Sequence, residues 1–137
     1  MTRKRYDPDD PREWLNRARS SLQWARQNAP EIYLEELCFG AQQAAEKAIK
    51  GVFVNLGEAF PYTHDLEKLL SLLSQKGVRV PDSIWRAQEL TPFAFEIRYP
   101  AVSMEIAEEE YRQALVIAEA VVRWAEEIIL EKGGQPA

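Results

Sequence analysis

The chain contains one histidine, His64, which is followed by Asp65 at the start of a leucine-rich segment. Imidazole and carboxylate groups act as general acids, general bases and metal ligands. Any catalytic or metal-binding site is therefore first expected at His64 and Asp65. A Ser-His-acid triad, a Cys-His pair or a multi-histidine metal site must either use this one imidazole or fail, which excludes much familiar catalysis. Two interpretations stay open: the imidazole makes a cap or a tertiary hydrogen bond, or it contacts a ligand or partner directly.

A second polar segment, Arg98-Tyr99-Pro100, begins six residues after Pro92. Proline cannot donate to a helical ladder and it restricts the residue before it, so we expect these side chains to project from a distorted backbone. The planar guanidinium of Arg98 suits carboxylate or phosphate. The segment is therefore either a binding site or a structural clamp, in which Arg98 pairs with Glu46 or Glu96.

A third group of polar residues follows helical spacing between residues 39 and 50. Phe39, Gln43, Glu46 and Lys50 are spaced i, i+4, i+7 and i+11 and share one helix face, with Lys47 beside them. Glu46 and Lys50 form a favourable i,i+4 pair worth about 0.2 to 0.5 kcal/mol. A solvated charged face is one interpretation, and a face turned to the arginine segment or to a second subunit is the other. The chain has no phosphate-binding glycine loop and no HExxH zinc motif.

Apolar residues recurring at spacings of three and four predict the helices that position these groups. The first helix should cover residues 11–28, with Asp10 as its cap and proline at its first position. The second should cover residues 31–56 and stop at Gly57. It carries the third polar group on one face and a seam of small residues on another, which would let a neighbouring helix approach closely.

The second half of the chain predicts shorter helices and one long one. Thr63 or His64 should cap a leucine-rich helix that ends at Gly77. A fourth segment starts at Pro81-Asp82 and should be kinked or split at Pro92. The last helix should be capped by Ser103 and run to about Leu130.

No segment shows sustained strand alternation, so the predicted fold is all-α, an up-and-down bundle of four to five helices. A chain of 137 residues is the size of one ordinary domain. We expect that domain to cover residues 11–131, between a mobile N-terminal arm at 1–10 and a flexible C-terminal tail at 132–137.

The composition excludes several classes of protein. With 46% apolar and 28% charged residues, the chain is not globally disordered. No apolar run reaches the roughly 18 to 20 residues of a membrane helix, and the first residues lack a signal peptide's apolar stretch, so we expect a cytoplasmic protein without membrane contact. A single cysteine, Cys38, rules out an internal disulfide and a cysteine-cluster zinc site. The net charge of −5 argues against a large nucleic-acid surface, although a local basic patch is allowed.

Three segments together resemble the successive signatures of a HEPN domain. They are Phe39-Gly40-Ala41-Gln42-Gln43-Ala44-Ala45-Glu46-Lys47-Ala48-Ile49-Lys50, then Thr63-His64-Asp65-Leu66, then Arg98-Tyr99-Pro100. Each is unspecific alone, but their order and spacing are distinctive, and the resemblance spans the chain from Trp14 to about Ile129. HEPN domains are four- to five-helix bundles, the fold that the periodicity predicts independently.

The resemblance further implies a prokaryotic homodimer paired with a minimal nucleotidyltransferase in a two-component or toxin–antitoxin system. Catalytic members of the family are metal-independent ribonucleases that use an Arg-x4-6-His motif at the start of the last helix. Counted from Arg98, the positions for that histidine hold Ser103, Met104 and Glu105, so the imidazole that would act as acid and base is missing.

We therefore predict a non-catalytic binding module for a nucleotide, a nucleotidyltransferase partner, or both, and expect no cofactor. The alternatives are a metal-independent ribonuclease toxin and a purely structural homodimer, the latter suggested by small-residue seams and several large aromatic residues. No catalytic or metal-ligating residue is assigned. The predicted ligand- or partner-binding residues are Lys47, His64, Asp65, Arg98 and Tyr99, with Gln43, Glu46 and Lys50 in support.

Overall fold

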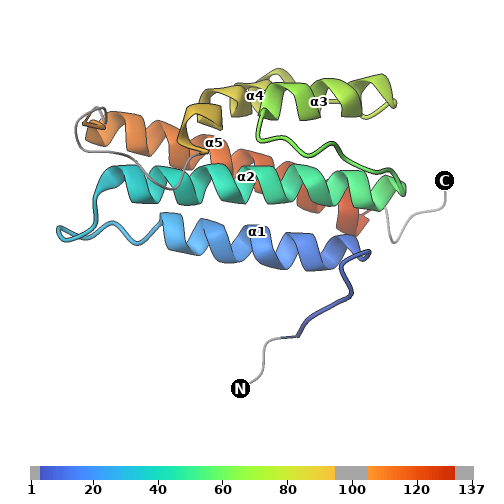
Figure 1. The fold of residues 1–137 in the computed structure, drawn as a ribbon, viewed down its shortest axis with the longest axis horizontal. Coiled ribbons are helices and arrows are strands. Elements are labelled where there is room, and N and C mark those ends of the chain that lie inside the picture. Colours follow the sequence, from blue (N-terminus) through green and yellow to red (C-terminus); the bar gives the residue numbers. More distant parts are fainter. Residues whose placement is uncertain (1–3, 95–104, 132–137) are drawn as a thin grey trace.

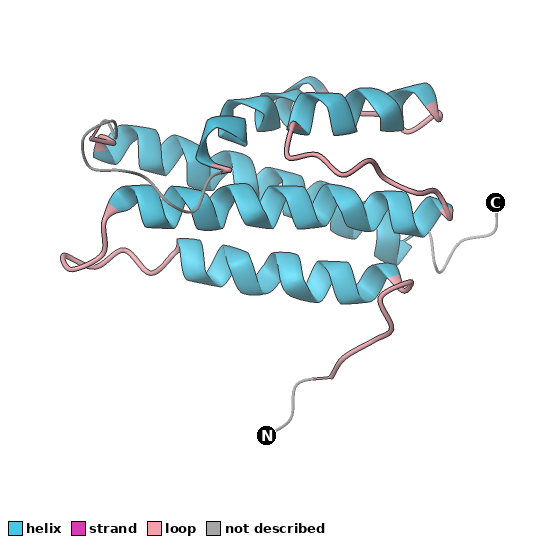
Figure 2. Ribbon diagram, in the orientation of Figure 1, coloured by secondary structure: helices cyan, strands magenta, loops and turns pink. Residues whose placement is uncertain are grey.

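The computed structural model describes residues 4–94 and 105–131, and all regular structure within them is helical (Figure 2). The predicted all-helical bundle is therefore confirmed. Its elements are α1 (Pro11–Ala25), α2 (Leu34–Leu56), α3 (Leu66–Gln75), α4 (Asp82–Trp85), the 3-10 helix η1 (Arg86–Phe93), α5 (Glu108–Glu126) and the π-helical turn η2 (Glu127–Glu131).

The central helix of the bundle is α2 (Figure 1). It lies antiparallel to α1, packs against α5, and also contacts α3 and η1. Small residues make this close packing possible, because the side chains at a contact set the distance between helix axes. The alanines of the predicted seam, Ala41, Ala44, Ala45 and Ala48, are all fully buried. Gly51 continues the seam, since a Cβ added there would lie 3.0 Å from the Cβ of Trp14.

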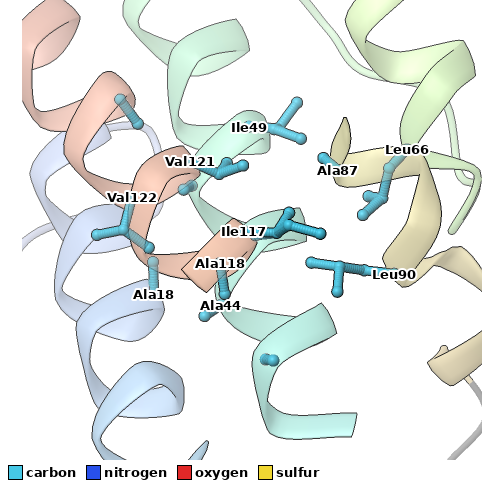
Figure 3. Close-up of a cluster of buried hydrophobic side chains, with 14 of the residues drawn as sticks. Ala18, Ala44, Ile49, Leu66, Ala87, Leu90, Ile117, Ala118, Val121 and Val122 are labelled. Carbon is cyan, nitrogen blue, oxygen red and sulfur yellow. The ribbon is translucent and has the colours of Figure 1, made fainter. Parts of the chain in front are cut away.

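The hydrophobic core joins all the layers in one cluster (Figure 3). Ile49 of α2 meets Ile117 and Val121 of α5, and Leu66 and Leu90 bring in α3 and η1. Burying one such branched side chain contributes about 1.5 to 3 kcal/mol. This core fixes α2 on several sides, so the polar residues on its remaining surface are held in place by packing.

Two helix ends follow the sequence predictions. Asp10 caps α1, where its carboxylate accepts a hydrogen bond from the backbone N–H of Arg12 at 2.9 Å. Gly57 ends α2 with a φ of 72°, a left-handed conformation that costs glycine nothing because it has no Cβ.

The loop between the first two helices is longer than predicted. The hydroxyl of Tyr111 donates to the carbonyl of Ala25 at 2.6 Å. That carbonyl would otherwise accept from residue 29, so α1 ends at Ala25 and not near residue 28. A turn at Pro30-Glu31 then delays the start of α2 to Leu34, three residues after the predicted start.

The predicted cap of α3 is wrong by one or two residues. Asp65 is the N-cap, and its carboxylate accepts from the backbone N–H of Lys68 at 3.1 Å. Thr63 supports the cap from outside the helix, because its hydroxyl accepts from the N–H of Asp65 at 3.1 Å. A carboxylate three residues before a free N–H is the better acceptor, which leaves His64 available for a tertiary contact.

Two further predictions need correction. The fourth segment does not break at Pro92 but changes from α-helix to 3-10 helix at Arg86, and Pro92 lies inside η1. In an α-helix, the carbonyl four residues before a proline has no N–H to accept from. In a 3-10 helix, the same carbonyl accepts from the N–H of the residue three positions later. The last helix starts at Glu108, where the Glu110 carboxylate accepts from the N–H of Ala107 at 3.1 Å. The predicted cap, Ser103, lies outside the described residues.

Candidate functional site

A buried carboxylate, Glu46 of α2, is the centre of the main polar network. Gln42 and Lys50 stand one helical turn before and after it, so all three share a face. The side-chain amide of Gln42 donates to Glu46 Oε1 at 2.7 Å, and Lys50 Nζ donates to Oε2 at 2.7 Å. Gln43 joins the network by donating to Gln42 Oε1 at 2.8 Å.

The turn before α3 brings His64 to this carboxylate. Its Nδ1 lies 2.9 Å from Glu46 Oε1, and the imidazole is half exposed whereas the carboxylate is buried. Burial opposes ionisation of Glu46, but hydrogen bonds from Lys50, His64 and Gln42 outweigh it and hold the pKa of that carboxyl below 4.5. An ionised carboxylate only accepts, so Nδ1–H of His64 is the donor. The network thus joins α2 to the turn that starts α3.

Every buried side-chain nitrogen and oxygen in the described part of the chain has a hydrogen-bond partner. In the Glu46 network, both carboxylate oxygens and the buried Lys50 ammonium are engaged, and Lys50 also lies 5.1 Å from the ring centroid of Phe60. A network with all its polar groups satisfied holds a fold in place. It offers little capacity to bind a further ligand, apart from the exposed edge of His64.

Lys47, the next residue on α2, has different surroundings. Its ammonium reaches α1 and donates to the hydroxyl of Ser21 at 2.9 Å. Among the described residues, no carboxylate lies within ion-pair distance of it. Burial lowers the pKa of the Lys47 ammonium below 10.5, and the positive charge of Arg17 lowers it further. Within the described part of the chain, Lys47 is therefore a partly buried cation without a paired counter-charge.

Lys47 lines a cavity of about 660 Å³ between α1, α2 and the segment before α1. The lining is strongly cationic and contains one acidic residue, Glu13. Its basic members are Lys4, Arg5, Arg17, Arg19 and Lys47. Two of the arginines already have partners, since Arg17 pairs with Glu13 at 2.8 Å and Arg19 with Glu126 at 2.7 Å. We call this cavity and its lining the Lys47 pocket.

Three side chains of α1 hold one wall of the Lys47 pocket in place. Glu13 accepts from the backbone N–H of Tyr6 at 2.9 Å. Asn16 donates to the carbonyl of Lys4 at 3.2 Å, and Trp14 donates to that of Pro8 at 2.9 Å. Residues 4–10, part of the segment predicted to be mobile, thus contact α1 through their main chain.

The structure divides the predicted site residues into separate groups. Gln43, Glu46, Lys50 and His64 are connected in one network, which Gln43 joins through Gln42. Lys47 belongs to the other pocket. Asp65 caps α3, whereas Arg98 and Tyr99 lie outside the described residues.

Of the residues that line the Lys47 pocket, sequence reasoning found only Lys47 and missed the other basic ones, which are Lys4, Arg5, Arg17 and Arg19. The signal was present in the distribution of charge. The first 26 residues contain seven Lys or Arg and four Asp or Glu, whereas the remainder contains ten and eighteen. The net charge of −5 averages these two parts and hides the basic one.

Within the described ranges, no cluster of three or more His, Cys, Asp or Glu side chains could hold a metal ion. The helices in those same ranges are too short or too polar to span a membrane.

Comparison with known proteins agrees with this helical bundle. The model of the HEPN domain family matches residues 11–128, which is most of the chain. The protein therefore belongs to the HEPN family. A search among curated proteins finds no match.

Two solved structures resemble the chain over most of its length. TT1696 from Thermus thermophilus is 29% identical, with a TM-score of 0.75, covering 87% of this chain and 98% of its own. ST0689, an archaeal HEPN homologue, is 28% identical with a TM-score of 0.69, covering 93% of this chain and 99% of its own. The prediction of a HEPN protein of the prokaryotic kind fits these relatives, one bacterial and one archaeal.

Proposed function

We propose that this HEPN protein is a non-catalytic binding module that holds a phosphate-bearing nucleotide in the Lys47 pocket. The observation that carries the proposal is the Lys47 ammonium, which is partly buried, bonded to a hydroxyl and without a carboxylate partner among the described residues. Removing a charge from water is costly unless an opposite charge accompanies it. A bound phosphate would supply that charge.

The rest of the pocket supports a ligand of this class. A cavity of about 660 Å³ can enclose a small molecule of nucleotide size, because ligand sites are typically about 300 to 1,000 Å³. Arg5 and Arg17 offer planar guanidinium groups that match phosphate oxygens, and Arg17 pairs with Glu13 through its Nε at 2.8 Å. Several cations along one wall suit a ligand with more than one phosphate.

The absence of catalysis is the second part of the proposal. The one imidazole of the chain donates to Glu46, and its role there is to join α2 to the turn before α3. No histidine stands at the spacing after Arg98 that the family's ribonucleases use. Without a histidine at that spacing, binding is the better-supported role for a phosphate site.

The same proposal includes a nucleotidyltransferase as partner and a homodimer as the working state, both implied by the family resemblance. A protein that binds nucleotide phosphates is a reasonable companion for an enzyme that transfers nucleotides. A gene beside this one that encodes a small protein with Gly-Ser and Asp-x-Asp signatures would support the pairing. Co-purification of the two products would test it, and separate elution at micromolar concentration would contradict it.

Calorimetric titration of the full-length protein with ATP and with GTP tests nucleotide binding. We expect Lys47→Gln to weaken binding by about 10- to 150-fold, because a charge-assisted hydrogen bond to phosphate contributes about 1.5 to 3 kcal/mol. The matched control is Lys76→Gln, which removes a surface lysine that pairs with Glu58. RNA incubated with the protein should stay intact.

Two results would contradict the proposal. One is the absence of binding heat and of any rise in melting temperature with either nucleotide at millimolar concentration. The other is an equal loss of binding in Lys47→Gln and Lys76→Gln, since a non-specific effect of charge would affect both variants alike.

A further inference from the structure

We propose that Lys47 is a modification site for acyl phosphates, small metabolites that carry an acyl group on a phosphate. The pocket would hold the phosphate while the Lys47 amine takes the acyl group. The proposal rests on the proposed function in one respect, because it needs the Lys47 pocket to bind phosphate. It assigns the pocket a second ligand class and a means of regulation.

The geometry distinguishes Lys47 from Lys50 and Lys76. Lys50 is buried, and its ammonium is held by Glu46 at 2.7 Å. Lys76 is on the surface and pairs with Glu58. Lys47 lines an open cavity, donates to a hydroxyl at 2.9 Å and faces a lining rich in arginine. It combines access, a neutral neighbour and nearby groups that recognise phosphate.

The protonation state of Lys47 also favours reaction. Burial and the charge of Arg17 lower the pKa of its ammonium, so a larger fraction is the neutral amine, which is the nucleophilic form. The Ser21 hydroxyl accepts one N–H of that group and orients it. Glu46 acts in the opposite direction, since its negative charge raises the pKa of Lys47, but by less than the other two effects.

The transfer is a substitution at the acyl carbon. The neutral amine of Lys47 attacks that carbon, a C–N bond forms, and the C–O bond to phosphate breaks. The phosphate leaves with the electron pair of that bond, and the nitrogen loses a proton to the departing phosphate or to water. Nothing is oxidised or reduced. Cationic groups such as Arg17 stabilise the charge that develops on the leaving phosphate.

Acylation would change what the pocket binds. An amide carries no charge, so the pocket would lose the cation that α2 contributes and part of its affinity for anions. Lys47 would then report the level of acyl phosphate as a reduced capacity to bind nucleotide.

The test uses the full-length protein and acetyl phosphate, with the rate at each lysine measured by mass spectrometry of peptides. We expect Lys47 to react at least about tenfold faster than Lys68 and Lys76, because a bound reagent raises the effective concentration at one amine. Inorganic phosphate should slow Lys47 and leave the other two unchanged. Acetic anhydride has no phosphate and serves as the matched reagent, and with it the preference for Lys47 should be smaller, because only the lowered pKa of the Lys47 ammonium then favours that residue.

A variant separates phosphate recognition from simple basicity. Arg17→Gln should slow the reaction of Lys47 with acetyl phosphate and reduce its inhibition by inorganic phosphate. Equal rates at all three lysines, or the same preference for Lys47 with both reagents, would overturn the proposal. If ATP binds but Lys47 shows no preference, this inference fails alone. If Lys47 is preferred but neither nucleotide binds, the modification stands and the nucleotide assignment fails.

Discussion

Glu46 and Lys47 are neighbours on α2, yet their charges have opposite surroundings. The Glu46 carboxylate is buried and accepts hydrogen bonds from three side chains. The Lys47 ammonium is partly buried and bonds to one hydroxyl. A charge that is fully satisfied stabilises the fold, whereas a charge without a counter-charge is free to favour a ligand. The difference indicates which polar residues of this domain are structural and which are available for binding.

The largest effect should come from Glu46→Ala. It leaves the buried ammonium of Lys50 without its partner, and breaking a buried ion pair from one side typically costs about 3 to 5 kcal/mol. Urea unfolding monitored by circular dichroism measures the loss. Glu58→Ala is the control, because its exposed pair with Lys76 should contribute less than about 1 kcal/mol. Similar losses in both variants would show that Glu46 is not a structural centre.

A smaller effect should appear on acidification. The folded-state pKa of Glu46 lies below 4.5, its usual value, so the unfolded chain binds a proton first as the pH falls. The stabilisation by the carboxylate is complete above 4.5 and is lost as the pH falls through the folded-state pKa. The difference in unfolding free energy between the natural chain and Glu46→Gln should therefore shrink from about pH 7 to about pH 3. A constant difference would mean that the ionised form contributes nothing.

The smallest effect on stability should come from Lys47→Gln. Because the ammonium lacks a carboxylate partner among the described residues and is repelled by Arg17, its loss should change the unfolding free energy by less than about 1 kcal/mol, and a gain is the expected sign. Lys50→Gln is the matched variant, and it should destabilise because Glu46 would be left buried without its ammonium. Equal destabilisation by the two variants would remove the distinction between the structural and the available lysine.

The sequence predicts most of the fold because helical periodicity and helix ends are local properties. The alanine seam, Asp10 and Gly57 behave as their residue types suggest. One error arises where a distant group intervenes. Tyr111 takes the carbonyl of Ala25 across 86 positions and shortens α1, an effect that no local pattern contains.

The candidate sites also differ in how far local sequence patterns could predict them. The pair of Glu46 and Lys50 could be predicted, since an i,i+4 spacing on one helix is sufficient. The contact of His64 with Glu46 was not predicted, because it depends on how the turn before α3 returns to α2 in space. The Lys47 pocket is lined by residues of three chain segments that meet only in the folded protein. The net charge of −5 is a sum over the whole chain and does not show that basic residues are concentrated near the N-terminus.

The way in which residues 4–8 are held has a consequence for how this protein can diversify. The three hydrogen bonds from α1 go to the N–H of Tyr6 and to the carbonyls of Lys4 and Pro8, which are main-chain atoms. The side chains of Lys4 and Arg5 can therefore be exchanged without loss of those bonds. Under the proposed function, the ligand preference of the pocket could change with these two residues while α1 beneath them keeps its hydrogen bonds to the main chain.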